Sequence, residues 1–328
     1  MQKDHYDVVV VGTGAAGLSA ALYTGRYRMN VLVVGGKFGG ETSSAGVIYN
    51  YPGVKDIDGY DLMKIMKEQA ESVGAEIIDG FVEKIEKRGA CFFVNIKDKS
   101  EIRANTVIFA TGTERKKLGL PNEEALRSKG IHYCTTCDGP LYVEKTIIVV
   151  GGGDAAIKGA NLSAEYASKI YILARGNSLR AEPINLERMK AFGGKITILY
   201  ETEVKEIIGT NKFEKIKLSK PFNGSDELSA DGLFVEIGAE PDITLPNALG
   251  ITLDEHGYIK ANALMQTNIE GIYVAGDAVN LFGTFKQDIT AACMGAVAAT
   301  SAYNFRKIHG DLCEIHSIPI KSESAVAS

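Results

Sequence analysis

The sequence has few cysteines, no block of like charge and no long apolar run. Five cysteines among 328 residues are too few for a scaffold held together by many disulfides. The formal net charge is −5, and without a basic patch nothing in the charge pattern favours binding to nucleic acid. No uninterrupted apolar stretch approaches the roughly 18 residues that cross a bilayer. Because the basic, apolar and small-residue regions of a signal peptide are also missing from the first residues, we expect a cytoplasmic protein without a membrane segment.

What the sequence does contain is one strand–turn–helix pattern, twice. A β-branched run at 8–11 leads into Gly12, Gly14 and Gly17, a small-residue helix and a second strand at 30–34. A strand at 146–150 leads into Gly151, Gly153 and Ala156, a helix to about residue 167 and a strand at 169–173. Glycines at this spacing let the backbone approach a pyrophosphate at the N-terminus of the helix. We therefore predict the α/β class, with two Rossmann-like, doubly wound, three-layer nucleotide-binding domains.

A cysteine pair, Cys134 and Cys137, lies between the two patterns. A C-x-x-C pair can interconvert between dithiol and disulfide, and its surroundings can make one thiol a reactive thiolate. Zinc is the competing interpretation, but a structural zinc site takes four ligands. His132 could be a third ligand and no fourth is evident, so we expect no metal. The next residue, Asp138, could transfer the proton of thiol–disulfide exchange, or could cap the turn-like segment 138–140.

The other three cysteines are isolated in the sequence. Cys91, in a strand-like stretch, and Cys293, in a small-residue helix, are expected to be buried apolar residues. Cys313 near the C-terminus is expected to be an exposed thiol, and we assign it no role.

Neither pattern has the usual acidic residue that binds a ribose hydroxyl. Gly35 and Gly36 stand at that place in the first pattern. In the second pattern Arg175 and Arg180 stand there, where arginines suit the 2′-phosphate of NADPH. The alternative is that both are solvated loop charges.

Further segments at 39–41, 50–53, 106–112 and 268–277, together with the glycine turns and the cysteine pair, resemble the low-molecular-weight thioredoxin reductases. These are FAD-dependent, class II pyridine nucleotide-disulfide oxidoreductases, and the resemblance extends from about residue 7 to 305. It implies an FAD-binding domain of residues 1–116 and 244–310, with an NAD(P)H-binding domain of residues 117–243 inserted into it. Residues 311–328 would form a polar C-terminal tail.

The resemblance also implies site residues. Those expected to bind FAD are Gly12, Gly14, Ala15, Ala16, Gly17, Gly35, Gly40, Glu41, Asn50, Val82, Ala110, Thr111, Gly112, Gly276, Asp277, Lys286, Gln287 and Asp288. Those expected to bind NADPH are Gly151, Gly153, Asp154, Ala155, Ala156, Arg175 and Arg180. Lys286 takes the place of an arginine of the family, which keeps the charge but loses the bidentate geometry.

The implied activity is reduction of a thioredoxin-like disulfide protein by a homodimer. Electrons pass from NADPH to FAD and then to the Cys134–Cys137 disulfide. By resemblance Cys137 faces the flavin, Cys134 attacks the disulfide of the partner protein, and Asp138 is the catalytic acid. Attack by a thiolate through a mixed disulfide is the general route of such exchange.

Two departures from the family leave the electron donor open. Ala174 and Gly176 replace polar residues of its NADPH-binding segment, and Lys158 and Gly159 replace a glutamate pair. One alternative is therefore the same chemistry with ferredoxin or another non-nicotinamide donor. A second alternative is a flavin reductase or ferredoxin–NADP reductase with the same fold, which would not need the cysteines. A third is a non-catalytic flavoprotein redox sensor.

Overall fold

The computed structural model describes residues 3–99, 101–283 and 285–313. The chain divides into two compact units. The first unit contains the residues up to Thr113 and those from Pro241 onward, and the second contains Glu114–Glu240. The boundaries thus lie at 113/114 and 240/241, where the sequence placed them at 116/117 and 243/244.

A seven-stranded sheet forms the centre of the first unit. Five strands are parallel, in the order β5 (Glu76–Asp79), β2 (Val31–Gly35), β1 (His5–Val11), β8 (Ile102–Phe109) and β19 (Ile272–Val274). The first half of β8 also pairs with an antiparallel ribbon of β7 (Cys91–Ile96) and β6 (Val82–Arg88). β8 can serve both partners because residues 102–104 pair with β7 and residues 107–109 pair with β19.

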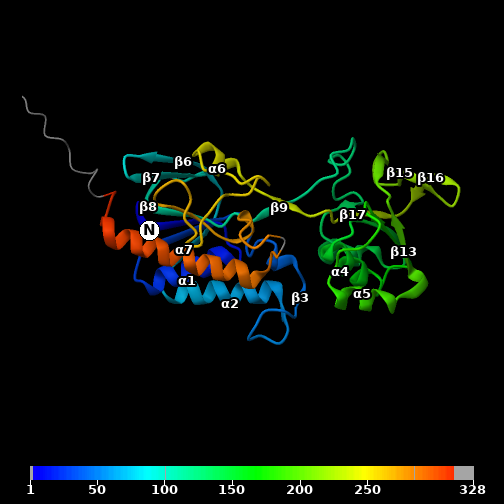
Figure 1. The fold of residues 1–328 in the computed structure, drawn as a ribbon, viewed down its shortest axis with the longest axis horizontal. Coiled ribbons are helices and arrows are strands. Elements are labelled where there is room, and N and C mark those ends of the chain that lie inside the picture. The colour runs from blue at the N-terminus through cyan, green and yellow to red at the C-terminus, as the bar shows by residue number, and fades with distance from the viewer. Residues whose placement is uncertain (1–2, 100, 284, 314–328) are drawn as a thin grey trace, which may run out of the picture. The chain divides into compact units, whose positions relative to one another are not determined.

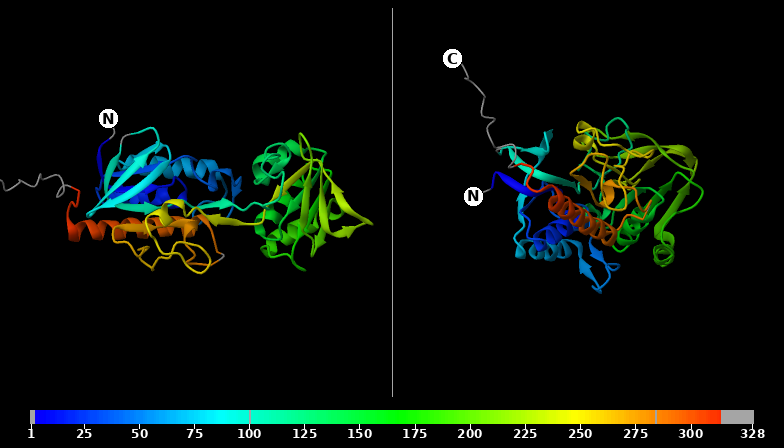
Figure 2. Two further views of the ribbon diagram at one scale, coloured as in Figure 1. Left: turned by 90° about the horizontal axis from the view of Figure 1, so that it is seen from above. Right: turned by 60° about the vertical axis from the view of Figure 1, so that its left-hand side comes forward.

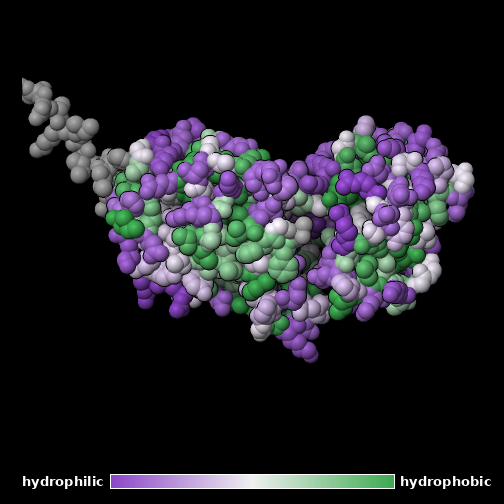
Figure 3. Space-filling model, viewed as in Figure 1, coloured by the Kyte–Doolittle hydropathy of each residue, from purple (hydrophilic) through white to green (hydrophobic). Residues whose placement is uncertain are grey.

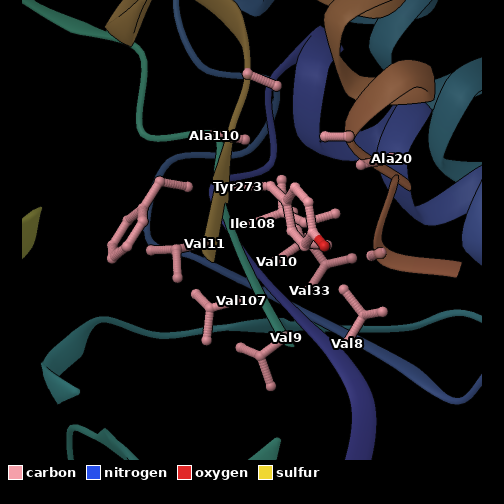
Figure 4. Close-up of a cluster of buried hydrophobic side chains, with 14 of the residues drawn as sticks. Val8, Val9, Val10, Val11, Ala20, Val33, Val107, Ile108, Ala110 and Tyr273 are labelled. Carbon is pink, nitrogen blue, oxygen red and sulfur yellow. The ribbon is translucent and has the colours of Figure 1, made fainter. Parts of the chain in front are cut away.

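The parallel strands are buried on both faces, which explains the β-branched run at their centre. Val8, Val9 and Val10 are fully buried. Figure 4 shows the valines of β1 among side chains of the neighbouring strands, including Val33, Val107, Ile108 and Tyr273. This cluster fixes β1, and with it the glycine turn that follows.

Three helices lie side by side next to the sheet (Figures 1 and 2): α1 (Ala15–Arg26), α2 (Gly59–Ser72) and α7 (Asp288–His309). Small residues bring α1 and α7 close together: a Cβ atom on Gly295 would lie 2.1 Å from the Ala16 carbonyl oxygen. The Ser19 hydroxyl donates to the Ala292 carbonyl at 2.7 Å. Within the described ranges no helix is long and apolar enough to cross a membrane.

The second unit is built on a five-stranded parallel sheet (green in Figures 1 and 2). Its order is β10 (Ile131–His132), β17 (Gly232–Val235), β11 (Thr146–Val150), β12 (Lys169–Ala174) and β13 (Ile196–Tyr200). An antiparallel sheet follows, of β14 (Val204–Ile208), β15 (Lys215–Phe222) and β16 (Ser225–Ser229). The helical segments are α3 (Thr135–Asp138), η2 (Gly139–Tyr142), α4 (Asp154–Ser163), α5 (Pro183–Lys190) and η3 (Gly193–Lys195).

Short elements complete the chain. The segments where it passes from one unit to the other form a two-stranded sheet of β9 (Thr113–Arg115) and β18 (Ala239–Pro241). The rest belong to the first unit: η1 (Thr42–Ser44), β3 (Val47–Ile48), β4 (Ile57–Asp58), α6 (Thr244–Ala248) and η4 (Gly276–Ala278).

The predicted α/β class with two Rossmann-type domains is confirmed. Both predicted strand–turn–helix patterns are present, although α4 ends at Ser163 rather than near residue 167. The β6–β7 ribbon and the β14–β16 sheet were not predicted, because their alternating residues lack a turn fingerprint as specific as the glycine pattern.

Among the three isolated cysteines, Cys91 is buried as expected, and the expectations for Cys313 and Cys293 were wrong. Cys91 and Cys313 form a disulfide across 222 positions of sequence, with their Cα atoms 4.9 Å apart, and both are 1% exposed. Cys313 is therefore not an exposed thiol. Cys293 is a free, exposed thiol on α7 and not a buried apolar residue. Of the predicted polar tail, residues 314–328 lie outside the described residues.

Candidate redox site and nucleotide-binding turns

The cysteine pair lies at the end of a strand of the second unit. β10 ends at His132, and α3 begins at Thr135 with Cys134 as its N-cap residue. Cys134 and Cys137 form a disulfide with Cα atoms 5.4 Å apart, and the Cys137 N–H donates to Cys134 Sγ at 3.2 Å. Cys137 is exposed and Cys134 is half-buried. A disulfide on such a short surface turn is accessible to an attacking thiol.

A buried glutamate holds this turn in place. The Thr135 N–H and hydroxyl both donate to Glu236 Oε1, at 3.1 and 2.8 Å. Glu236 Oε2 pairs with Arg115 Nη1 at 3.1 Å, and the Glu236 side chain is only 4% exposed. Sequence reasoning missed this residue, although a glutamate directly after the buried strand β17 was an available signal.

The departure from the family at Gly159 has a packing reason. A Cβ atom on Gly159 would lie 2.5 Å from Thr135 Oγ1. Any larger side chain here would push the cysteine turn away from α4. Thr135, the residue after the first redox cysteine, therefore requires a glycine at position 159.

Asp138 faces a histidine. Its Oδ2 lies 3.1 Å from His132 Nδ1, and its side chain is 37% exposed. Asp138 precedes η2 but makes no side-chain cap hydrogen bond there. The capping interpretation of Asp138 therefore finds no support, and the carboxylate remains next to the redox pair.

The first glycine turn is shaped by close main-chain contacts. Gly12 has a φ of 118°, and a Cβ atom on it would lie 2.1 Å from the Ala110 carbonyl oxygen. A Cβ atom on Gly17 would lie 2.0 Å from the Gly12 carbonyl oxygen. At Gly14, the N-cap residue of α1, the nearest atom would be 3.9 Å away. The turn is thus tight inside and open toward the N–H groups at the start of α1, where an anionic group binds favourably.

The carboxyl ends of three strands meet at this turn. The Ala110 N–H donates to the Val11 carbonyl and the Ala275 N–H donates to the Phe109 carbonyl, both at 2.8 Å. These bonds place Ala110, Thr111 and Gly112 beside Gly12, and Gly276 and Asp277 beside them. Thr111 Oγ1 is buried without a hydrogen-bond partner among the described residues. A buried, unpaired hydroxyl is rare and fits a site that receives a polar ligand.

Two predicted carboxylates in this region, Asp277 and Asp288, are partly buried. Burial raises the pKa of the Asp277 carboxyl, and neighbouring carboxylates reinforce this against the opposing charge of Lys286. Burial also raises the pKa of Asp288, which accepts a hydrogen bond from the Thr42 hydroxyl at 2.5 Å. Carboxylates with shifted pKa values of this kind are typical of ligand sites.

The remaining predicted residues of the first site are placed as follows. Asn50 Nδ2 donates to Gln287 Oε1 at 2.9 Å, so the structure brings these two together. The Lys286 ammonium bonds the carbonyls of Asp277 and Val279 and lies 4.1 Å from the Tyr258 ring centre, so it is tied to the chain itself. Glu41 pairs with Lys37 at the surface. Of the other predicted residues, Gly35 lies beside Thr13 and Gly40 lies close to Gly14. Ala15 and Ala16 are buried on α1, and Val82 packs on the core.

The second glycine turn, between β11 and α4, is fixed by the segment after β12. The Arg180 N–H donates to the Gly152 carbonyl at 2.6 Å. Asp154 Oδ1 accepts from the Glu182 N–H and the Asn185 amide at 3.0 and 2.8 Å. Asp154 is thus bound to this segment. Gly153, Ala155 and Ala156 follow the expected turn, with Ala156 fully buried.

Arg175 and Arg180 lie at the edge of this second turn. Both are exposed, and neither guanidinium has an ion-pair partner in the described part of the chain. By contrast Lys158, in place of a family glutamate, lies 2.7 Å from Asp154 Oδ2 and 4.0 Å from Glu182 Oε2. The two arginines remain available to an anionic ligand.

Comparison with known proteins agrees with this arrangement. Residues 6–300 match the family described as pyridine nucleotide-disulphide oxidoreductase. The chain belongs to this family. It is also 38% identical to a thioredoxin reductase of Streptomyces coelicolor, over 92% of this chain and 94% of the relative.

Solved structures place the chain among the thioredoxin reductases of this family. The thioredoxin reductase of Lactococcus lactis matches with a TM-score of 0.84 and 36% identity, over 92% of this chain and 98% of the other. A ferredoxin-flavin thioredoxin reductase of Clostridium acetobutylicum matches with a TM-score of 0.50 and 33% identity, over 93% and 99%. One of these relatives is thus named for ferredoxin, and the others are named only as thioredoxin reductases.

Proposed function

We propose that the chain is a flavin-dependent thioredoxin reductase that carries electrons from NADPH through FAD to the Cys134–Cys137 disulfide. The observation that carries the proposal is the redox disulfide of the second unit, in a chain that also contains two dinucleotide-type turns. A disulfide alone could be structural. Its exposed position, its neighbour Asp138 and the family membership favour a redox role.

FAD suits the first unit. The Gly12–Gly17 turn and the start of α1 would hold its pyrophosphate, while Asp277 and the unpaired Thr111 hydroxyl offer polar contacts. When bound, FAD supplies two-electron redox chemistry. The chain's own contribution is to bind and orient the group and to shield it with the surrounding strands.

NADPH suits the second unit. The Gly151–Ala156 turn would hold the pyrophosphate, and the exposed Arg175 and Arg180 guanidinium groups would bind the 2′-phosphate. The second candidate keeps the same disulfide chemistry but takes electrons from ferredoxin. The missing polar side chains at Ala174 and Gly176 and the similarity to a ferredoxin-flavin relative favour it.

The two cysteines would then carry out disulfide exchange. Once the pair is reduced, the Cys134 thiolate attacks the disulfide of a thioredoxin-like protein and releases one partner sulfur as a thiolate. The Cys137 thiol then attacks the resulting mixed disulfide and loses its proton, the second partner sulfur leaves and gains one, and the Cys134–Cys137 disulfide is restored. Two electrons leave the pair, and Asp138 moves the proton that passes between thiol and thiolate.

We further propose a cytoplasmic homodimer formed by the first unit. Two adjoining hollows of about 410 and 960 Å³ run along α1, α2 and α7, and both are lined by Tyr23, Cys293 and Ala296. Figure 3 shows hydrophobic residues gathered on the face over α7, and Ile65 and Ile308 are 45% and 77% exposed. Exposed apolar surface of this kind is typical of a protein interface. Sedimentation at twice the chain mass of 35.2 kDa would support the dimer.

Anaerobic flavin reduction tests the electron donor. The protein carrying its flavin is mixed with NADPH, NADH or reduced ferredoxin, and the visible flavin absorbance is followed. We expect NADPH to bleach it, and we expect Arg175→Ala and Arg180→Ala each to raise the NADPH concentration required by roughly tenfold, because each loses a charge-assisted hydrogen bond. The NADH concentration required should be the same in all variants, because NADH has no 2′-phosphate. Lys212→Ala, which removes an exposed cation of the same unit, serves as the control. Flavin that ferredoxin bleaches while both nicotinamides fail would establish the second candidate instead.

A further inference from the structure

Asp138 is the exposed end of a chain of three side chains in the second unit. His132 Nδ1 lies 3.1 Å from Asp138 Oδ2, and His132 Nε2 lies 2.7 Å from the Tyr142 hydroxyl. Both His132 and Tyr142 are buried, at 6% and 8% exposure. We propose that His132 is a positioning residue for thiol–disulfide exchange, which orients the Asp138 carboxyl group beside the cysteine pair. This inference rests on the proposed disulfide-reductase function.

The two partners of His132 determine its tautomer. A carboxylate only accepts hydrogen bonds, so Nδ1 must carry the proton and donate to Asp138. Nε2 is then the acceptor of the Tyr142 hydroxyl. Burial, reinforced by the charges of Asp138 and Asp231, raises the pKa of Tyr142 to about 12. The phenol therefore remains a donor throughout the neutral range and holds His132 in this tautomer.

Packing prevents the imidazole from turning away. The ring of His132 stacks on Phe234 with centroids 5.2 Å apart and an interplanar angle of 23°. The register of β10 and β17 places these two residues opposite each other. The Tyr142 ring meets His132 edge-on at 5.5 Å. Nδ1–H is thus aimed at one place, the carboxylate of Asp138.

A buried histidine most often has a purely structural role. Two features distinguish His132: both ring nitrogens bond side chains, and the bonded series leads from the interior to the residue directly after Cys137. A fixed donor at the carboxylate is what an acid–base group needs when it alternates between its two protonation states.

The role follows from the proton balance of the exchange. The Cys137 thiol loses a proton when its sulfur attacks the mixed disulfide, and the departing partner sulfur gains one. Asp138 can take the first proton and give the second, so no net proton is required. While Asp138 is a carboxylate, the His132 Nδ1–H stabilises it by a charge-assisted hydrogen bond.

The test uses single turnover of the full-length protein, without a donor or a protein partner. The cysteine pair is first reduced chemically, and its reoxidation is then followed with an aliphatic disulfide and with an aromatic disulfide. An aliphatic thiolate is a poor leaving group that benefits from protonation, whereas an aromatic thiolate leaves readily without it. All variants carry Cys293→Ser to remove the exposed thiol, and Cys134→Ser gives the background.

We expect His132→Leu to slow the aliphatic reaction about tenfold or more, because a charge-assisted hydrogen bond to the acid–base group is lost. The aromatic reaction should slow less, because its leaving thiolate needs no proton and only the deprotonation of Cys137 still depends on Asp138. His132→Asn keeps a short N–H donor and should recover most of the aliphatic rate. Tyr142→Phe, which leaves the histidine in place, should slow the aliphatic reaction to a smaller degree.

Equal rates for His132→Leu and wild type with the aliphatic disulfide would overturn the inference. So would an equal loss with both disulfides, because the loss would then not depend on whether the leaving sulfur needs a proton. If His132→Leu does not fold, the aliphatic and aromatic rates of His132→Asn and Tyr142→Phe are compared with those of wild type by the same criteria. Because the assay needs neither nucleotide nor thioredoxin, its outcome is separate from that of the proposed function, which fails if wild type reduces no disulfide protein with any donor.

Discussion

At the scale of single residues, Glu236 connects the redox turn to the body of the second unit. Its carboxylate accepts two hydrogen bonds from Thr135 and pairs with Arg115 on β9. A buried carboxylate is stabilised only while such partners remain in place. The position of Cys134 therefore depends on a residue 102 positions further along the chain (236 − 134).

Replacing Glu236 by alanine should loosen the cysteine turn. The substitution removes the acceptor of the Thr135 N–H and the ion pair between Glu236 and Arg115, which costs about 1–3 kcal/mol. Thr135→Val removes only the hydroxyl bond and should cost about 1 kcal/mol. Denaturant unfolding measures both, with Glu240→Ala at an exposed position as a control that should stay within about 0.5 kcal/mol of wild type. Equal stability of Glu236→Ala and wild type would contradict this role.

The sequence indicates which residues are candidates for the chemistry but not which residues hold them in place. Cys134, Cys137 and Asp138 could be predicted because they form one short motif. His132 was visible only as a histidine close to the pair, and its partner Asp138 could equally have been a turn cap. Glu236 reaches Thr135 only because β17 pairs with β10, which is a property of the sheet and not of any local pattern.

At the scale of elements, α4 is joined to the loop after β12 through Asp154. Burial works against ionisation of Asp154, but hydrogen bonds from Lys158, the Glu182 N–H and Asn185 outweigh it and leave the pKa below its usual value of 3.8. The charged form is thus favoured in the folded state. This link holds the second glycine turn and the Arg180 segment together.

The contribution of Asp154 should depend on pH. Because its pKa is lowered on folding, the contribution is fully present above about pH 4 and is lost as the pH falls through the folded-state pKa. Asp154→Asn keeps an acceptor but loses the charge, so at pH 7 we expect a loss of about 0.5–1 kcal/mol, since Lys158 is half-exposed and the pair is screened. Urea unfolding at several pH values should show that the difference in free energy of unfolding between Asp154→Asn and wild type becomes smaller as the pH falls. A difference that grows on acidification would exclude this explanation. Lys158→Met, which removes the partner of Asp154, should show the same decrease of its difference from wild type.

The Cys91–Cys313 disulfide fixes the segment after α7 to strand β7. Replacing both cysteines by serine should lower the free energy of unfolding by about 2–4 kcal/mol, because the cross-link restricts the unfolded chain. Cys293→Ser, on the exposed face of α7, should leave it unchanged. A thiol count on the oxidised, denatured protein should find one free thiol among the five cysteines. A count of three would show that this disulfide does not form.

Elements with a local signature were predictable, and long-range links were not. The strand, turn and helix at 8–22 and at 146–163 fall within about twenty residues each, and the glycine spacing defines them. The pairing of Cys91 with Cys313 spans 222 positions. Two isolated cysteines give no sign of it, because only the fold brings the end of α7 beside β7.

At the scale of the whole molecule, the chain consists of one compact unit inserted into another. The first unit carries the Gly12–Gly17 turn with Asp277, and the second carries the Gly151–Ala156 turn with the cysteine pair. The order of these motifs along the chain was readable from the sequence, and it predicted the division of labour that we propose. In the proposed function, electrons bound for a partner disulfide leave through Cys134 and Cys137.

Trapping the mixed disulfide tests this central claim most directly. Cys137→Ser removes the resolving thiol, so the reduced variant should remain linked to a thioredoxin-like protein through Cys134, and mass spectrometry of the joined peptides should locate the bond there. Cys134→Ser is the matched control and should trap no comparable adduct. An adduct through Cys137 or Cys293, or turnover that survives Cys134→Ser, would contradict the account.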